Sequence, residues 1–208
     1  MTSSESSVGG TGAREEILGR VRAALAPSKE KPRSRQISRA YRDVATHPDP
    51  VSLFVERVTD YQATVRLVSA IGVADAIAAE VEGMHCIVPV DLPWDLSNAD
   101  VDELQTANEL DTYDAVVTGA QVGIAETGTI VLDHQGDQGR RAITLVPDRH
   151  ICVIRTDQIV AGVPEAIAEL NPQRAQTWIS GPSATSDIEL TRVEGVHGPR
   201  KLVVLVVY

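Results

Sequence analysis

The chain is 208 residues long and carries 19 Lys and Arg residues against 29 Asp and Glu residues, a formal net charge of −10. This length is enough for one domain with its own hydrophobic core and a short arm, without disulfides or metals. Hydrophobic residues make up 43% of the chain and charged residues 23%, which excludes a disordered, collagen-like or coiled-coil protein.

Two segments are predicted ahead of the main domain. Residues 1–12 are rich in Ser and Gly, which indicates a disordered leader. Apolar residues recur at helical spacing between Ala13 and Ala26, so an amphipathic helix is expected there, followed by a basic linker from Pro27 to Gln36. Helix and linker form an arm over residues 13–49. The sequence leaves open whether this arm docks on its own domain, on a second copy or on another subunit.

Residues 50–208 alternate between helical and strand periodicity, which predicts one α/β domain with a parallel or mixed sheet flanked by helices. Helices are expected at 53–61, 73–81, 100–110 and 163–170. Strands are expected at 64–68, 86–90, 115–118, 129–133, 143–146, 151–155, 177–180 and 201–207, with 129–133 as the second strand of a hairpin.

Charge is distributed unevenly along the chain. Nine basic residues face three acidic ones between Arg14 and Arg42, whereas Leu67 to Gly139 contains 14 acidic residues and no Lys or Arg. The acidic body, poor in aromatic residues, would repel nucleic acid, so the basic arm is better suited to an acidic protein surface. The stretch without basic residues ends at Arg140 and Arg141. Arginines presented together bind carboxylates and phosphates.

Other absences limit the chemistry. No Lys occurs between Pro32 and Arg200, which excludes a Walker-type phosphate loop there. Cys86 and Cys152 lie in apolar runs typical of buried strands in a reducing compartment, and two thiols are too few for an iron–sulfur cluster. Neither a secretory signal nor a membrane span is recognisable, so a cytoplasmic protein without membrane contact, metal or cofactor is expected.

A first candidate site is the segment Ala125-Glu126-Thr127-Gly128-Thr129. A carboxylate beside a tight Gly turn is one way to present a general base or a nucleophile. The alternative is an ordinary hairpin turn, in which Gly128 supplies a positive φ and Glu126 is solvated.

Two further segments combine Gly with polar residues at strand ends, where open α/β sheets place ligands. In Ser180 to Glu189, hydroxyl and carboxylate residues follow a Gly-Pro turn and are expected to open a helix, either as an anion site or as simple capping. In Gly195 to Arg200, a His stands between two glycines. A relay of Ser183, His197 and Asp187 is not supported by their spacing, and the Gly-x-Ser-x-Gly elbow of hydrolases is absent.

The candidate catalytic residues are therefore Glu126, Ser183 and His197. The residues predicted to bind a substrate or anion are Thr127, Gly128, Thr129, Arg140, Arg141, Gly181, Pro182, Thr185, Asp187, Gly198 and Arg200.

Four motifs follow one another along the chain: Ile124 to Leu132, Arg140-Arg141 ahead of Leu145 to Ile151, Ile179 to Glu189, and Gly195 to Pro199. Together, in this order, they resemble the lactate utilization protein C family, which is built on the LUD domain. The resemblance covers roughly residues 51–208. It implies a fold related to the NagB, ribose-5-phosphate isomerase and CoA-transferase-like group. CoA transferases of that group use a Glu near a Gly turn, and Glu126 is the nearest counterpart by this fold-level analogy.

The resemblance also implies a role in a bacterial system that oxidises L-lactate to pyruvate, with iron–sulfur clusters in two partner proteins and none in this chain. A first hypothesis makes this chain the non-cluster subunit, with a pocket for a small carboxylate such as L-lactate or pyruvate and a docking arm. A second makes it a stand-alone transferase or isomerase acting on an acyl-CoA or small phosphorylated acid through Glu126. Whether the chain is itself an enzyme, and whether it forms a homo-oligomer, stays open.

Overall fold

A computed structural model of the chain describes residues 11–25, 47–185, 193–194 and 198–208. The chain divides into two compact units, residues 1–41 and residues 42–208. In the first unit, helix α1 (Thr11–Leu25) occupies most of the range in which a helix was expected and begins two residues earlier, within the segment assigned to the leader. Its apolar residues Ile17, Val21 and Leu25 are exposed. The rest of the predicted leader and the linker lie outside the described residues.

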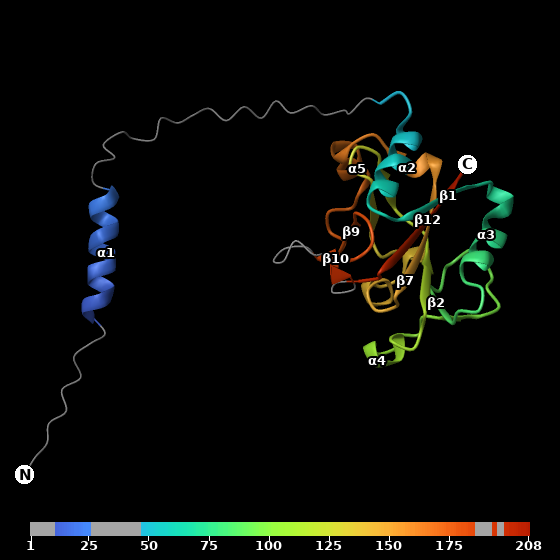
Figure 1. Ribbon diagram of the computed structural model, residues 1–208, viewed down its shortest axis with the longest axis horizontal. Helices are drawn as coiled ribbons and strands as arrows, with labels where there is room; N and C mark the ends of the chain where they lie inside the picture. Colours follow the sequence, from blue (N-terminus) through green and yellow to red (C-terminus); the bar gives the residue numbers. More distant parts are fainter. Residues whose placement is uncertain (1–10, 26–46, 186–192, 195–197) are drawn as a thin grey trace, which may run out of the picture. The chain divides into compact units, whose positions relative to one another are not determined.

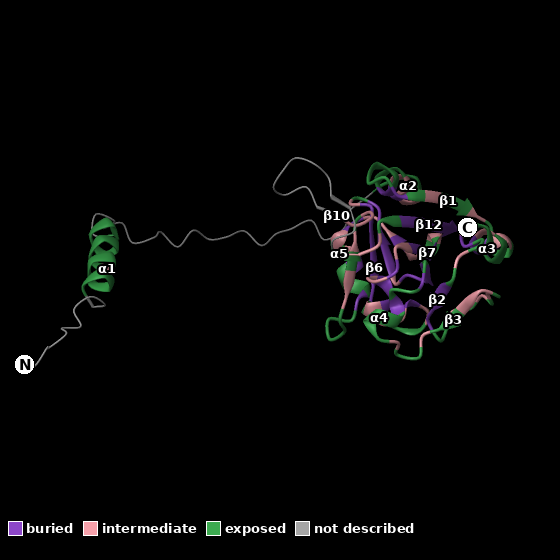
Figure 2. Ribbon diagram, turned by 60° about the horizontal axis from the view of Figure 1, so that its bottom comes forward, coloured by how far each residue is buried: buried purple, intermediate pink, exposed green. Residues whose placement is uncertain are grey.

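The second unit is built on a six-stranded sheet in which every neighbouring pair is parallel. In spatial order, its strands are β1 (Thr64–Val68), β12 (Lys201–Val207), β7 (Arg149–Arg155), β4 (Ala115–Thr118), β2 (Cys86–Val88) and β3 (Ala99–Val101). The continuous apolar runs of β12 and β7 are buried on both faces, as expected for parallel strands at the centre of a sheet. Figure 2 shows these strands in the interior of the domain.

A second, four-stranded sheet combines parallel and antiparallel pairs. Its strands, in spatial order, are β8 (Ile159–Val160), β5 (Val122–Ile124), β6 (Thr129–Leu132) and β9 (Thr177–Ile179). Strands β5 and β6 form the predicted hairpin. The expectation of one mixed sheet is thereby corrected, because the antiparallel strands leave the parallel sheet and form a separate layer.

The helices cover the sheets and are α2 (Pro50–Asp60), α3 (Val73–Glu80), α4 (Ala107–Leu110) and α5 (Val163–Glu169) (Figure 1). On one face of the parallel sheet, Phe54 of α2 and Ile130 of β6 share a core with Cys152 and Val204. On the opposite face, Ile77 of α3 packs in a core with residues such as Leu205. Helix α5 covers the outer face of the second sheet, so the domain is layered as helix, sheet, sheet and helix.

Two predicted elements differ from the structure. The segment 100–110 was expected to be one helix, but it contains β3, a loop and the four-residue α4. Thr106 and Glu109 form a reciprocal capping box at the start of α4. The segment 143–146 was expected to be a strand. It belongs instead to a 3-10 turn, η3 (Arg141–Thr144), in which Ile143 is buried.

The expected helix start after Ser183 is also wrong for the residues that are described. Strand β10 (Ala184–Thr185) pairs antiparallel with β11 (Val193–Glu194), so these residues are extended. Of the other 3-10 turns, η1 (Ala70–Gly72) joins β1 to α3, η2 (Gly136–Gln138) follows β6, and η4 (Thr156–Gln158) joins β7 to β8. Among the described residues, no helix has the length and apolar character that crossing a membrane requires.

Candidate functional site

A cavity of about 200 Å³ lies between the edge strand β9 of the second sheet and the amino ends of β7 and β12. Its described lining residues are Arg141, Thr144, Leu145, His150, Thr177, Trp178, Ile179, Ser180, Gly181, Pro182, Ser183, Gly198, Pro199 and Leu202. Open α/β sheets commonly bind ligands at the carboxyl ends of their strands, so this cavity, called here the β9 pocket, lies at the opposite end.

The β9 pocket gathers predicted site residues from three separate segments. Those that line it are Arg141, Gly181, Pro182, Ser183 and Gly198. The backbone N–H of Ser183 donates to the carbonyl of Pro199 at 2.8 Å, which holds the two predicted loops together. Gly181 has a φ of +87°, and a Cβ there would lie 2.5 Å from Cβ of Tyr61, so this turn requires glycine.

Arg141 differs from the other arginines of this unit. Among the described residues of 42–208, each of the other seven arginines lies within ion-pair distance of a carboxylate; they are Arg57, Arg66, Arg140, Arg149, Arg155, Arg174 and Arg200. The guanidinium of Arg141 has no such partner among them, and it lines the β9 pocket. The pocket therefore holds a positive charge that no described carboxylate neutralises.

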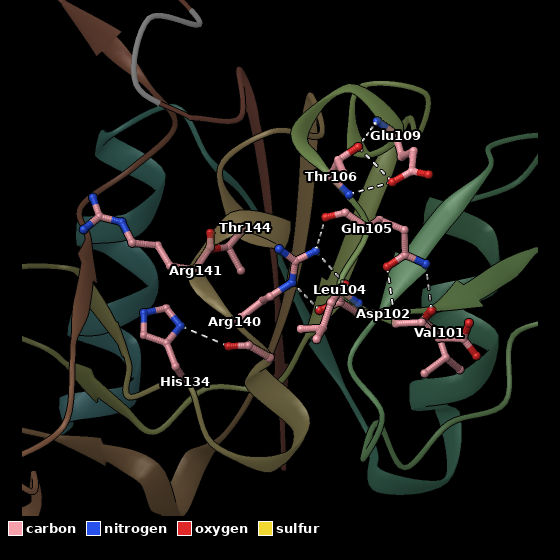
Figure 3. A network of polar contacts seen from close by, with 12 residues as sticks. Val101, Asp102, Leu104, Gln105, Thr106, Glu109, His134, Arg140, Arg141 and Thr144 are labelled. Carbon is pink, nitrogen blue, oxygen red and sulfur yellow. Dashed lines mark hydrogen bonds and ion pairs between the residues drawn. The ribbon is translucent and has the colours of Figure 1, made fainter.

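Arg140 has a different environment, although the sequence predicts the same role for both arginines. Its Nε and Nη2 donate to the two carboxylate oxygens of Asp102 at 2.7 and 2.8 Å, and Nη2 also donates to the carbonyl of Gln105. The Asp102 side chain is only 8% exposed. Figure 3 shows the guanidinium groups of Arg140 and Arg141 pointing away from each other. Arg140 thus binds an internal carboxylate and fixes the loop before α4.

Hydroxyl groups connect the hairpin turn to the pocket wall. Oγ1 of Thr127 lies 2.7 Å from Oγ1 of Thr129, which lies 2.9 Å from Oγ of Ser180. Thr127 and Thr129 are not among the lining residues, whereas Ser180 is. The two predicted threonines consequently reach the pocket only through Ser180.

A second chain of hydrogen bonds reaches the pocket through His134. Its Nε2 lies 2.8 Å from Oγ1 of Thr177, and its Nδ1 lies 3.0 Å from the carbonyl oxygen of Gly139. His134 follows β6, and its proximity to Thr177 is set by the pairing of Leu132 with Thr177 in the β6–β9 ladder. His134 has a φ of +61°, a conformation uncommon for residues other than Gly and Asn.

His150 forms part of the pocket wall and is 1% exposed. Its Nε2 lies 2.8 Å from Oγ1 of Thr118. Burial lowers the pKa of His150 to about 4, so the imidazole is neutral at neutral pH. This histidine adds polarity to the wall without adding charge.

Glu126 lies in the tight turn between β5 and β6 and is exposed. Its backbone N–H donates to the carbonyl of Ala161 at 3.0 Å, and Gly128 has a φ of +59°. The hairpin-turn interpretation of this segment is therefore confirmed. Glu126 is not among the residues that line the β9 pocket, and a catalytic role for it stays a prediction.

The remaining predicted residues lie elsewhere or are not described. The guanidinium of Arg200 binds the carboxylate of Asp148, with Nη2 2.9 Å from Oδ2, and these hydrogen bonds lower the pKa of Asp148. Arg200 borders an adjoining, wider cavity of about 660 Å³, which shares Leu145 and Gly198 with the β9 pocket. Asp187 and His197 lie outside the described residues, as does the side chain of Thr185.

Sequence reasoning missed Thr144, Thr177 and His134 as residues of the pocket and its surroundings. The only signal for His134 was its place beside the glycines of the loop that leads to Arg140. Thr177 was predicted correctly as a strand residue, but nothing in the sequence places it opposite a histidine 43 positions away.

Both cysteines are core residues. Cys86 and Cys152 are buried and free, and burial raises the pKa of their thiols to about 11 and about 12, so both stay protonated at neutral pH. Within the part of the chain that the structure describes, no three His, Cys, Asp or Glu side chains are grouped as a metal site would need.

Comparisons with known proteins agree on one family. The family model described as the LUD domain matches residues 63–207. A lactate utilization protein C of Deinococcus radiodurans is 52% identical over 164 residues, covering 74% of this chain and 77% of that protein. A lactate utilization protein C of Bacillus licheniformis is 32% identical over 122 residues, covering 55% of this chain and 49% of that protein.

One solved structure supports the same assignment. The crystal structure of a DUF162 family protein from Deinococcus radiodurans aligns with a TM-score of 0.68 and 42% sequence identity, covering 79% of this chain and 99% of that chain. The residues that the LUD domain model matches include both sheets and the whole described wall of the β9 pocket. The chain therefore belongs to the LUD domain family.

Proposed function

We propose that this chain contributes to lactate utilization by binding a small carboxylate in the β9 pocket, as the non-cluster subunit of a system that oxidises L-lactate to pyruvate with iron–sulfur partner proteins. The relatives named lactate utilization protein C support the general role. The pocket residues support the binding of a carboxylate.

The observation that carries the proposal is the guanidinium of Arg141. A positive charge next to a cavity, without a carboxylate partner among the described residues, attracts an anion from solution. Arg presents paired N–H groups whose spacing matches the two oxygens of a carboxylate. Thr177 and Ser180 line the same cavity, and their hydroxyls are hydrogen-bonding groups for the rest of a small ligand.

The size of the β9 pocket favours a small acid over a nucleotide-bearing substrate. Lactate has six non-hydrogen atoms and occupies on the order of 100 Å³, about as much as three or four water molecules. It fits a cavity of about 200 Å³, whereas pockets for larger ligands measure roughly 300–1,000 Å³. This argues against the alternative of a transferase acting on an acyl-CoA through Glu126, which does not line the pocket.

Binding can be tested by thermal denaturation of the purified protein with L-lactate, pyruvate or inorganic phosphate. A ligand at 100 times its Kd adds about 2.7 kcal/mol of stability, which corresponds to a rise in Tm of roughly 5–10 °C for a domain of this size. We expect this rise with at least one of the two carboxylates.

Arg141→Gln is expected to weaken that binding about 10- to 100-fold, since it removes hydrogen bonds to a charged group. Arg155→Gln is the matched control, because Arg155 is an exposed arginine paired with Asp157 and does not line the pocket. Equal effects of the two substitutions, or no binding of either acid by the unaltered protein, would refute the proposed pocket.

The proposed partners require a separate test. We expect the tagged full-length chain, purified from cells grown on lactate, to recover iron–sulfur proteins together with iron and acid-labile sulfide. The exposed residues Ile17, Val21 and Leu25 of α1 are apolar groups available for such a contact. Recovery of the chain alone, at several salt concentrations, would contradict the assembly while leaving the pocket intact.

A further inference from the structure

Two hydroxyl groups in the wall of the β9 pocket have their protons engaged by the protein itself. Thr144 donates its hydroxyl proton to the carbonyl oxygen of Arg141 at 3.0 Å. Thr177 is paired with Nε2 of His134 at 2.8 Å. Both residues line the pocket, so the direction of the second hydrogen bond determines what the wall offers a ligand.

The partner of the other ring nitrogen fixes that direction. A carbonyl oxygen only accepts hydrogen bonds, so Nδ1 of His134, 3.0 Å from the carbonyl of Gly139, carries a hydrogen. In the neutral imidazole Nε2 is then unprotonated and accepts the proton of Thr177. The oxygen of Thr177 keeps its lone pairs but has no proton left to donate, and the same holds for Thr144.

This part of the pocket wall consequently offers acceptors, while Arg141 offers donors. A ligand that matches both carries a carboxylate for Arg141 and a hydrogen-bond donor near the carboxylate for Thr177. A 2-hydroxy acid has this combination. A 2-oxo acid has a carbonyl acceptor at the same position, which would face the lone pairs of Thr177 without a hydrogen between them. Ser180 is less selective, because either it or Thr129 can be the donor in their hydrogen bond.

We infer that Thr177, held by His134, makes the pocket selective for 2-hydroxy acids over 2-oxo acids and over acids that lack a second polar group. The inference rests on the proposed function and adds the chemical class of the ligand. It assigns His134 a positioning role, because this residue acts on the ligand only through the hydroxyl of Thr177.

Calorimetric titration of the full-length protein with L-lactate, pyruvate and propionate tests the selectivity. These three-carbon acids differ only at the carbon next to the carboxylate. This carbon carries a hydroxyl in L-lactate, is a carbonyl in pyruvate and is a methylene in propionate. The unaltered protein is expected to bind L-lactate most tightly. Thr177→Val keeps the shape of the side chain and should weaken L-lactate binding about 3- to 10-fold, the effect of one uncharged hydrogen bond, without changing propionate binding. Thr177→Ser should restore the preference.

His134→Asn provides a second variant with a different expected outcome. Asn tolerates the positive φ at this position, but its shorter side chain releases the proton of Thr177. The hydroxyl can then donate to a carbonyl, so the preference for L-lactate over pyruvate should shrink or reverse. A merely structural role of His134 would lower the affinity for all three acids by the same factor.

The outcomes separate this inference from the proposed function. If none of the three acids binds the unaltered protein, the carboxylate pocket itself is wrong. If the acids bind and Arg141→Gln weakens their binding as expected, but Thr177→Val and His134→Asn leave their relative affinities unchanged, the pocket stands and the selectivity by Thr177 is refuted.

Discussion

Burial of His150 should make the stability of the domain depend on pH. An unperturbed histidine has a pKa of 6.5, and burial lowers that of His150 to about 4 in the folded domain. Between these values the unfolded chain binds more protons than the folded one, so the free energy of unfolding decreases as the pH falls. The stability is fully present above about pH 7, and about 2 kcal/mol of it is lost between pH 7.5 and pH 5.

Urea denaturation at the two pH values measures this loss. Other groups also titrate in this range, so the informative quantity is the difference between pH 7.5 and pH 5 in each variant. His150→Leu should reduce that difference by about 2 kcal/mol, because the leucine has no proton to bind. Thr118→Val removes the hydrogen-bonding partner but leaves His150 buried, so the pH dependence should persist. If His150→Leu and the unaltered protein lose the same stability on acidification, burial of a neutral imidazole is not its source.

Two paired substitutions test other features of the fold by the same denaturation measurement. Asp102→Asn breaks the two-point contact with Arg140 in a nearly buried setting and should lower the free energy of unfolding by about 2 kcal/mol. Asp157→Asn on the exposed surface should lower it by less than about 0.5 kcal/mol. Similar losses of stability in the two variants would contradict the role of burial. Gly128→Ala and Gly83→Ala both place a side chain at positive φ, which costs about 1 kcal/mol, but only at Gly128 would the Cβ lie 2.7 Å from a neighbouring side chain. Gly128→Ala should therefore be the more destabilising of the two by at least about 1 kcal/mol. Equal losses of stability would show that the backbone of the turn shifts to accommodate the added Cβ.

The sequence predicted helices and strands correctly where one hydrophobic period, that of a helix or that of a strand, dominates a segment. The apolar runs of β7 and β12 and the spacing of Leu53, Phe54 and Val58 in α2 determine these elements locally. The segment 143–146 misled because its apolar residues resemble a strand, yet only Ile143 and Thr144 are buried and the backbone forms a 3-10 turn.

The candidate site was predictable only in part, because its decisive contacts join residues far apart in the sequence. Arg140 and Arg141 look equivalent in the chain, and their difference depends on Asp102, 38 positions before Arg140. The turn glycines and Ser183 could be recognised from composition. The pairing of His134 with Thr177 requires the register of β6 against β9, which the sequence pattern does not specify.

The position of β12 between β1 and β7 also bears on how the domain folds. Among the described strands, β1 lies at the edge of the sheet and pairs only with β12, with Thr64 opposite Val203. Almost the whole domain lies between these two residues in sequence, and such long-range pairings slow folding because a large loop must close before any contact forms. We expect slow refolding, with amide protection in β1 acquired after protection in β4 and β7. Until that step, β1 would leave one edge of β12 open to pairing with other chains.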